Sequence, residues 1–291
     1  MNSNPVLIRP VTIASICGSF DAEEGKKLVT AAAARKPDLI LLPEAWQGMD
    51  PEPMDSRMIG SMRDISRTYG VYILHPTVIT EESRSTNTAL LFDRRGDLAG
   101  RYDKIYPYWE EMPAIRPGAT DQCVIDCDFG KLGIFICFDA NFPCIWANAE
   151  EQGAELIVWP SAYAAGSQLA AHALNHHYPI VTCTQPGYCM VFDIDGSRTV
   201  NVHRDSPFIQ WVTLDLDRCI FHENFNTDKL ESLLKEVPPR VEVEKHRTEE
   251  QWFIVRSARE GFSARQVCRE AGMEELRDYK RRSRNFIDAM R

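Results

Sequence analysis

Three short runs of the chain carry no polar side chain, and they constrain the fold more than any other feature. They are LILLP (Leu39–Pro43), LGIFIC (Leu132–Cys137) and LIVWP (Leu156–Pro160). A strand with one face in water alternates apolar and polar side chains, whereas a strand covered on both faces is apolar throughout. The chain is therefore predicted to form an α/β protein whose sheet lies in an internal core.

Amphipathic segments separate further runs rich in β-branched residues, as expected for alternating strands and helices. The turn signals DRRGD (Asp93–Asp97) and DIDGS (Asp193–Ser197) predict hairpins, so we expect mixed rather than purely parallel sheets. Strands are expected at Val11–Cys17, Asp38–Leu42, Val71–Val78, Asn87–Asp93, Cys123–Asp126, Leu132–Cys137, Leu156–Trp159, Ile180–Cys183, Met190–Asp193 and Phe208–Leu214. Helices are expected at Ala22–Arg35, Ser56–Tyr69, Ile145–Gln152 and Gly166–His176.

The composition changes near Glu223, where charged residues become dense and strand-like runs shorten to Val241–Val243 and Trp252–Val255. Residues 223–291 hold 15 Lys and Arg against 14 Asp and Glu, which leaves about −10 on the rest of a chain of net charge −9. We expect a body, residues 1–222, followed by a helical arm, residues 223–291. Its last two helices, broken near Gly272, hold too few apolar residues for a core of their own, so the arm is expected to pack on the body or a partner subunit.

Several classes of protein are disfavoured by charge and by the absence of motifs. The acidic balance argues against nucleic acid, no run of about 18 apolar residues predicts a membrane span, and the first residues do not resemble a secretory leader. We expect a soluble cytoplasmic protein. Nine cysteines without a CxxC pair predict reduced thiols, and His172 and His176 lack the intervening Glu of a zinc motif, so no metal is expected.

Two of the apolar runs lead into chemically reactive side chains. Glu44 follows LILLP, Cys137 ends LGIFIC, and Lys104 lies between them in RYDKIYP. Groups just beyond the carboxyl ends of strands line the ligand crevice of α/β sheets. Taken singly, Glu44 is also explained as a helix cap, Lys104 as a surface lysine and Cys137 as an inert core residue.

The combination resembles the nitrilase superfamily, whose members carry a Glu, a Lys and a Cys in this order. The matching stretches are LLPEAW, RYDKIYP, GIFICFDANFP and GAELIVWPSAY, and the resemblance covers roughly residues 10–216. It implies an α/β fold of the α-β-β-α four-layer sandwich type with mixed sheets, and a carbon–nitrogen hydrolase domain over residues 1–222. It also implies a cysteine hydrolase without a cofactor that associates as a homodimer or larger homo-oligomer.

The resemblance assigns roles to individual residues. Cys137 would be the nucleophile, Glu44 the base, and Lys104 with the backbone N–H of Phe138 the donors that stabilise the oxyanion. The family's second carboxylate lies seven residues before a Gly, which at Gly118 selects Glu111, with its neighbour Glu110 as the alternative. A papain-like Cys–His pair and a nucleotide site lack their motifs in this sequence.

The residues after Cys137 bear on the substrate. Phe138 and Asp139 replace the Trp-Glu common in relatives that hydrolyse nitriles, and Ala140 and Asn141 replace the Arg residues frequent in relatives acting on N-carbamoyl amino acids. CFDANFPCIW is closer to the amidase pattern, so we expect a small neutral amide, with a ureido compound as the alternative substrate.

Four residues are candidates for contacts with the substrate. Three other functions also remain possible for the chain. The candidates are Trp109, Asn141, Tyr163 and His172, while Trp46 and Trp159 also lie beside the motifs as potential pocket walls. The competing functions are a nitrilase, a silent scaffold on the same fold and a nucleic-acid-binding protein that uses its C-terminal helices.

Overall fold

The computed structural model describes residues 6–82, 84–121 and 123–291. The chain divides into two compact units. The larger is Val11–Thr213, and the smaller joins Leu214–Arg291 to the N-terminal stretch that ends at Pro10.

The first sheet of the larger unit has the strand order β12-β1-β2-β3-β4-β5. Strands β1, β2 and β3 pair in parallel, whereas β3, β4 and β5 pair antiparallel. The predicted hairpin joins β4 to β5, with the Gly96 N–H donating to the Asp93 carbonyl at 2.9 Å. The strands are β1 (Pro10–Cys17), β2 (Leu39–Leu41), β3 (Tyr72–Glu81), β4 (Arg84–Phe92), β5 (Leu98–Asp103) and β12 (Phe208–Asp215).

The second sheet has the order β11-β10-β9-β8-β7-β6 and is mixed in the same way. Its central strands β7, β8 and β9 are parallel, and antiparallel strands flank them on both sides. The second predicted turn, Asp193–Ser197, joins β10 to β11. The strands are β6 (Val124–Cys127), β7 (Gly130–Ile134), β8 (Leu156–Ser161), β9 (Ile180–Thr184), β10 (Tyr188–Phe192) and β11 (Arg198–His203).

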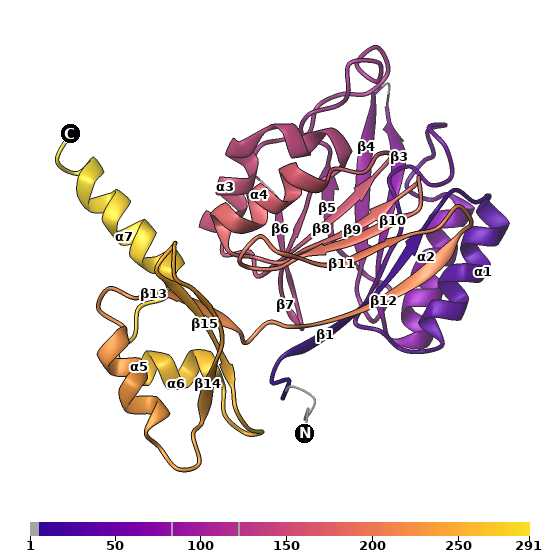
Figure 1. Cartoon of the computed structure of the whole chain (residues 1–291). Coiled ribbons are helices and arrows are strands. Elements are labelled where there is room, and N and C mark those ends of the chain that lie inside the picture. Colours follow the sequence, from indigo (N-terminus) through magenta and orange to yellow (C-terminus); the bar gives the residue numbers. More distant parts are fainter. Residues whose placement is uncertain (1–5, 83, 122) are drawn as a thin grey trace. The chain divides into compact units, whose positions relative to one another are not determined.

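The two sheets stack face to face, and helices cover their outer faces (Figure 1). Between the sheets, the Ser15 hydroxyl donates to the Thr182 carbonyl at 2.9 Å. Helices α1 (Ala22–Ala33) and α2 (Arg57–Tyr69) bury their apolar sides in one core with the first sheet. Helices α3 (Pro143–Glu151) and α4 (Gly166–His176) lie over the second sheet. The predicted α-β-β-α sandwich with mixed sheets is confirmed.

Strands β5 and β11 were not expected, because each lies at or near a sheet edge and has no continuous apolar run. Strand β7 is shorter than predicted. It ends at Ile134, and Cys137 begins a separate short 3₁₀ helix, Cys137–Asn141.

The smaller unit contains a three-stranded antiparallel sheet with the order β13-β15-β14 and three helices. Its elements are β13 (Cys219–His222), α5 (Thr227–Leu234), β14 (Val241–Arg247), β15 (Trp252–Ser257), α6 (Ala264–Glu270) and α7 (Leu276–Asp288). The arm expected over residues 223–291 is not purely helical, since it also contains β14 and β15, and α5 and α6 share a core with these strands. Phe221, Leu230, Val241, Phe253 and Val267 pack in a separate core, to which strands and helices far apart in sequence contribute.

The division of the chain also differs from the expected boundary after residue 222, because β13 pairs with β15 inside the smaller unit. The two predicted terminal helices are present as α6 and α7. Ser263 caps α6 through Gln266, and Gly272, at φ +74°, separates the helices. Among the described residues, no helix is both long and apolar enough to span a membrane.

Candidate active site

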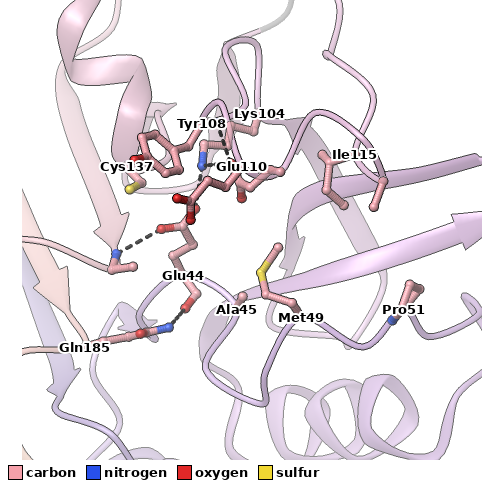
Figure 2. A pocket seen from close by; sticks show the side chains of 13 residues that line it. Glu44, Ala45, Met49, Pro51, Lys104, Tyr108, Glu110, Ile115, Cys137 and Gln185 are labelled. Carbon is pink, nitrogen blue, oxygen red and sulfur yellow. Dashed lines mark hydrogen bonds and ion pairs between the residues drawn. The ribbon is translucent and has the colours of Figure 1, made fainter.

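The candidate catalytic side chains come from turns that follow strands of both sheets. Glu44 lies three residues after β2, Lys104 directly follows β5, and Glu111 lies in the segment that follows Lys104. Cys137 opens the 3₁₀ helix after β7. Figure 2 shows Glu44, Lys104 and Cys137 converging on one cavity. The structure therefore brings together the four residues expected to form the catalytic set.

Lys104 is the centre of a buried charged network. Its Nζ lies 2.7 Å from Glu44 Oε1 and 2.6 Å from Glu111 Oε2, and its side chain is 1% exposed. Burial alone lowers the pKa of Lys104, but the negative charges of Glu44 and Glu111 and the hydrogen bond to Glu111 outweigh it, so the pKa is raised overall. The ammonium is therefore fully charged at neutral pH, and two of its three N–H groups are engaged.

Backbone N–H groups also bind both carboxylates. The Ala162 N–H donates to Glu44 Oε2 at 2.9 Å, and the Tyr108 N–H donates to Glu111 Oε2 at 2.6 Å. The Gln185 amide donates to the Glu44 carbonyl at 2.7 Å and holds the turn itself. Both carboxylates are thus fixed in orientation before any ligand arrives.

Asn87 is a member of the network that sequence reasoning missed. It lies in β4, is fully buried, and its Nδ2 donates to Glu44 Oε1 at 2.8 Å and to Glu111 Oε1 at 2.9 Å. A signal was present, since Asn is depleted in strands and here interrupts the run STNTALLF.

The turn that carries Cys137 is held in an unusual backbone conformation. Cys137 has φ +48°, in the left-handed region that non-glycine residues rarely adopt. Its carbonyl accepts from Trp159 Nε1 at 3.1 Å. The buried carboxyl of Asp139 fixes the rest of the turn, and burial raises its pKa to about 7 although three donors oppose the shift. These donors are the Ile136 N–H, the Tyr102 hydroxyl and the Tyr106 N–H, at 2.7 to 2.9 Å.

Burial also raises the pKa of Cys137, to about 12, and the negative charge of Glu44 adds to the effect while Lys104 opposes it. The resting group is therefore a thiol at neutral pH. A thiol reacts as a nucleophile only after it loses its proton, so a base must remove that proton during the attack. The backbone N–H of Phe138 has no acceptor among the described residues and is available to a ligand.

Cys137 opens onto two adjoining cavities. The larger, of about 510 Å³, is lined by Glu44, Ala45, Met49, Pro51, Lys104, Tyr108, Glu110, Glu111, Ala114, Ile115, Cys137, Ala162 and Gln185. The smaller, of about 370 Å³, is lined by Tyr108, Cys137, Phe138, Asn141, Ala162, Tyr163 and Gln168. Within these linings Lys104 is the one cationic side chain, and it already pairs with two carboxylates.

The candidate substrate-contacting residues have different outcomes. Asn141 and Tyr163 line the smaller cavity. Trp109 does not fit the expectation, since its side chain is 81% exposed and its neighbour Tyr108 lines both cavities instead.

His172 does not fit the expectation either. Its ring is buried, stacks on Trp146 and hydrogen-bonds the Ala140 carbonyl at 2.8 Å. Trp46 and Trp159 are likewise core residues.

The geometry favours Glu111 over Glu110 as the second carboxylate, because Lys104 forms an ion pair with Glu111. Glu110 instead lines the cavity wall. Within the described part of the chain, no group of three His, Cys, Asp or Glu side chains is arranged to hold a metal ion.

Comparison with known proteins gives amidases and nitrilases among the relatives of this chain. A deaminated glutathione amidase from Yersinia enterocolitica is 33% identical over 123 residues, which are 38% of this chain and 43% of that protein. A nitrilase from Pyrococcus abyssi is 28% identical over 150 residues, covering 47% of this chain and 57% of that protein. The matched part of the chain thus spans about half the length of these curated relatives.

Solved structures share the fold. A member of branch 10 of the nitrilase superfamily from Saccharomyces cerevisiae superposes with a TM-score of 0.63 at 18% identity, covering 74% of this chain and 93% of that one. An amidase from Nesterenkonia sp. superposes with a TM-score of 0.62 at 23% identity, covering 73% and 94%. The family model of the carbon–nitrogen hydrolases matches residues 21–221, which include all four residues of the charged network and Cys137. The chain belongs to the carbon–nitrogen hydrolase family.

Proposed function

We propose that this protein is a cysteine-dependent amidase that hydrolyses the non-peptide carbon–nitrogen bond of a small neutral amide through a thioester. The observation that carries the proposal is a buried Glu44–Lys104–Glu111 network that shares a cavity with the Cys137 thiol. A buried ion-pair network contributes little net stability, because desolvation offsets the Coulomb attraction. A network of this kind beside a nucleophile is better explained by catalysis.

In the first half of the reaction, Glu44 takes the proton of Cys137 as the sulfur attacks the amide carbon. The negative charge that forms on the carbonyl oxygen is stabilised by the free N–H of Lys104 and the backbone N–H of Phe138. Loss of one such donor typically costs about 3–4 kcal/mol of transition-state stabilisation. Glu44 then gives its proton to the departing nitrogen, so that ammonia or an amine leaves and the acyl group remains on sulfur as a thioester.

In the second half, a water molecule attacks the thioester and Glu44 takes its proton. The same two donors stabilise the second oxyanion, and collapse releases a carboxylic acid and returns the thiol. Glu111 shares Lys104 with Glu44 throughout, which keeps the ammonium neutralised without engaging its third N–H. No step requires a cofactor.

The charge of the cavities supports a neutral substrate. The larger cavity carries three carboxylates, Glu44, Glu110 and Glu111, against the single ammonium of Lys104, and the lining of the smaller one carries no charged side chain. A substrate carboxylate would find no free cation there and would be repelled. A variant of the Nesterenkonia amidase, at 21% identity, has been solved with butyramide, a small neutral amide of the proposed kind.

A panel of amides and ureido compounds tests the proposal. We expect ammonia release from short neutral amides and, in the intact protein, a mass increase at Cys137 equal to the acyl group. Cys137→Ala is the control, because it removes the nucleophile with a small change in buried volume. Turnover by Cys137→Ala, or turnover of ureido acids in preference to neutral amides, would contradict the mechanism or the substrate class respectively.

A further inference from the structure

We propose that Asn87 is a positioning residue of this site: its side-chain amide holds the carboxylates of Glu44 and Glu111 together beside Lys104, so that Glu44 stays oriented toward Cys137. The inference deepens the proposed function, on which its kinetic part rests. Its central test reads the reactivity of Cys137 directly and needs no substrate.

The side chain of Asn87 bridges the two carboxylates. Its Nδ2 donates one N–H to Glu44 Oε1 at 2.8 Å and the other to Glu111 Oε1 at 2.9 Å. Two carboxylates around one ammonium repel each other, and Lys104 holds each of them by one oxygen. The amide adds a second, uncharged donor between them and closes a ring of hydrogen bonds.

The orientation of the amide follows from its neighbours. Were the amide rotated by 180°, its oxygen would face two carboxylate oxygens, which is electrostatically unfavourable. In the favourable orientation Oδ1 is buried and has no hydrogen-bond partner among the described residues. An unsatisfied buried acceptor destabilises a fold, so an Asn at this position is poorly explained by packing alone.

The position in the sheet makes the bridge rigid. Asn87 lies within β4, which pairs with β3 on one side and β5 on the other, and the backbone carbonyl of Asn87 accepts from the Lys104 N–H at 2.8 Å. The residue that bridges the carboxylates is therefore also tied to the backbone of the lysine they share. The side chain of Thr88, the next residue, points to the opposite face and donates to Asp103 at 2.6 Å.

The titratable groups around this ring come from several elements. They are Glu44 after β2, Lys104 after β5, Glu110 and Glu111 in the following loop, Cys137 after β7 and Tyr163 after β8. Replacing Asn87 by Asp would add a third carboxyl to the ring. A third negative charge favours the protonated form of Glu44, so that less of it is present as free base, and it also opposes loss of the Cys137 proton. Both effects slow the reaction of the thiol.

The experiment measures alkylation of Cys137 by iodoacetamide as a function of pH, with each cysteine-containing peptide quantified by mass spectrometry. We expect Asn87→Asp to slow alkylation of Cys137 about tenfold at pH 8. The exposed Cys144 serves as an internal reference and should react at an unchanged rate. On a neutral amide, the acid limb of the kcat/KM profile should move to higher pH by about one unit, with KM little changed.

Thr88→Val is the matched control, since it removes a buried hydrogen bond from the adjacent residue on the other face of β4. We expect it to lower the unfolding midpoint without changing either pH profile. Asn87→Ser, which keeps one donor and adds no charge, should lower the alkylation rate to a smaller extent, and it carries the test if Asn87→Asp does not fold. An unchanged rate and pH profile in folded Asn87→Asp or Asn87→Ser, or an equal change in Thr88→Val, would overturn the inference. If no amide is turned over by the unaltered protein, the proposed function fails while the alkylation result still decides the role of Asn87.

Discussion

Replacing Lys104 by Met removes the centre of the charged network with little change in side-chain volume. Glu44 and Glu111 would then be like charges close together, with side chains only 4% and 12% exposed. Breaking a buried ion pair by removing one partner costs about 3–5 kcal/mol. The free energy of unfolding of a natural domain is about 5–15 kcal/mol, so the variant is expected to lose a large part of its stability.

A second lysine provides the matched control. Lys131 Nζ lies 2.6 Å from Asp126 Oδ1, the same distance as between Lys104 and Glu111. The side chains of Lys131 and Asp126, however, are 45% and 80% exposed. Water screens such a pair, so Lys131→Met should change the free energy of unfolding by about 0–1 kcal/mol. Urea titrations at pH 7, followed by tryptophan fluorescence, compare both variants with the unaltered protein.

The pH dependence gives an independent check. The pKa of Lys104 is raised in the folded state, so its stabilising contribution is fully present below the ordinary lysine pKa of about 10.4 and is lost only as the pH rises through the folded value. In Lys104→Met the uncompensated carboxylates favour binding protons in the folded chain, so the loss of stability should shrink between pH 7 and pH 5. A loss at pH 7 no larger than that of Lys131→Met would refute the reasoning.

Other perturbations follow from the same site. Cys137→Ala should abolish turnover in a folded protein, and Glu44→Gln should lower kcat by orders of magnitude, both measured by ammonia release; normal thioester formation in Glu44→Gln would exclude Glu44 as the base. Glu110→Gln should raise kcat/KM several-fold for amides with a distal carboxylate and leave neutral amides unchanged, and the effect should fade with added salt. We further propose a homodimer or larger homo-oligomer in which the exposed Phe286 and Ile287 of α7 are covered, so replacing both by Ser should shift sedimentation toward the monomer.

The central strands of the larger unit could be predicted because strands that are buried on both faces are continuous apolar runs in the sequence. Its helices could be predicted because their apolar residues recur along one side. Strand β11 was missed because it has no continuous apolar run: only Val200 and Val202 alternate with polar residues, and its side chains are exposed or half-buried. The small core around Phe221, Val241 and Phe253 escaped prediction for a different reason. Each segment contributes a few apolar residues, and only the β13–β15–β14 pairing brings them together.

The site residues that could be predicted from the sequence lie in recognisable motifs. The residue that was missed can be recognised only by its contacts with residues distant in the chain. Glu44, Lys104 and Cys137 follow strands, where position alone suggests a role. Asn87 is 43 residues from Glu44, and its bridging contact depends on the register between β4 and its neighbours. Trp109 was chosen because it adjoins a motif, but in a loop the side chains of adjacent residues can point in opposite directions.

The proposed base and the proposed nucleophile of this site are supplied by different sheets, so the reaction requires that the two sheets have packed together. Glu44 and Lys104 follow strands of the first sheet, whereas Cys137 follows a strand of the second. In a newly made or partly unfolded chain whose two sheets have not packed together, Cys137 lacks its proposed base. Such a chain is therefore not expected to form a thioester with small amides in the cell. The fraction of molecules labelled at Cys137 by an amide-derived probe would therefore measure the fraction of correctly folded protein in a preparation.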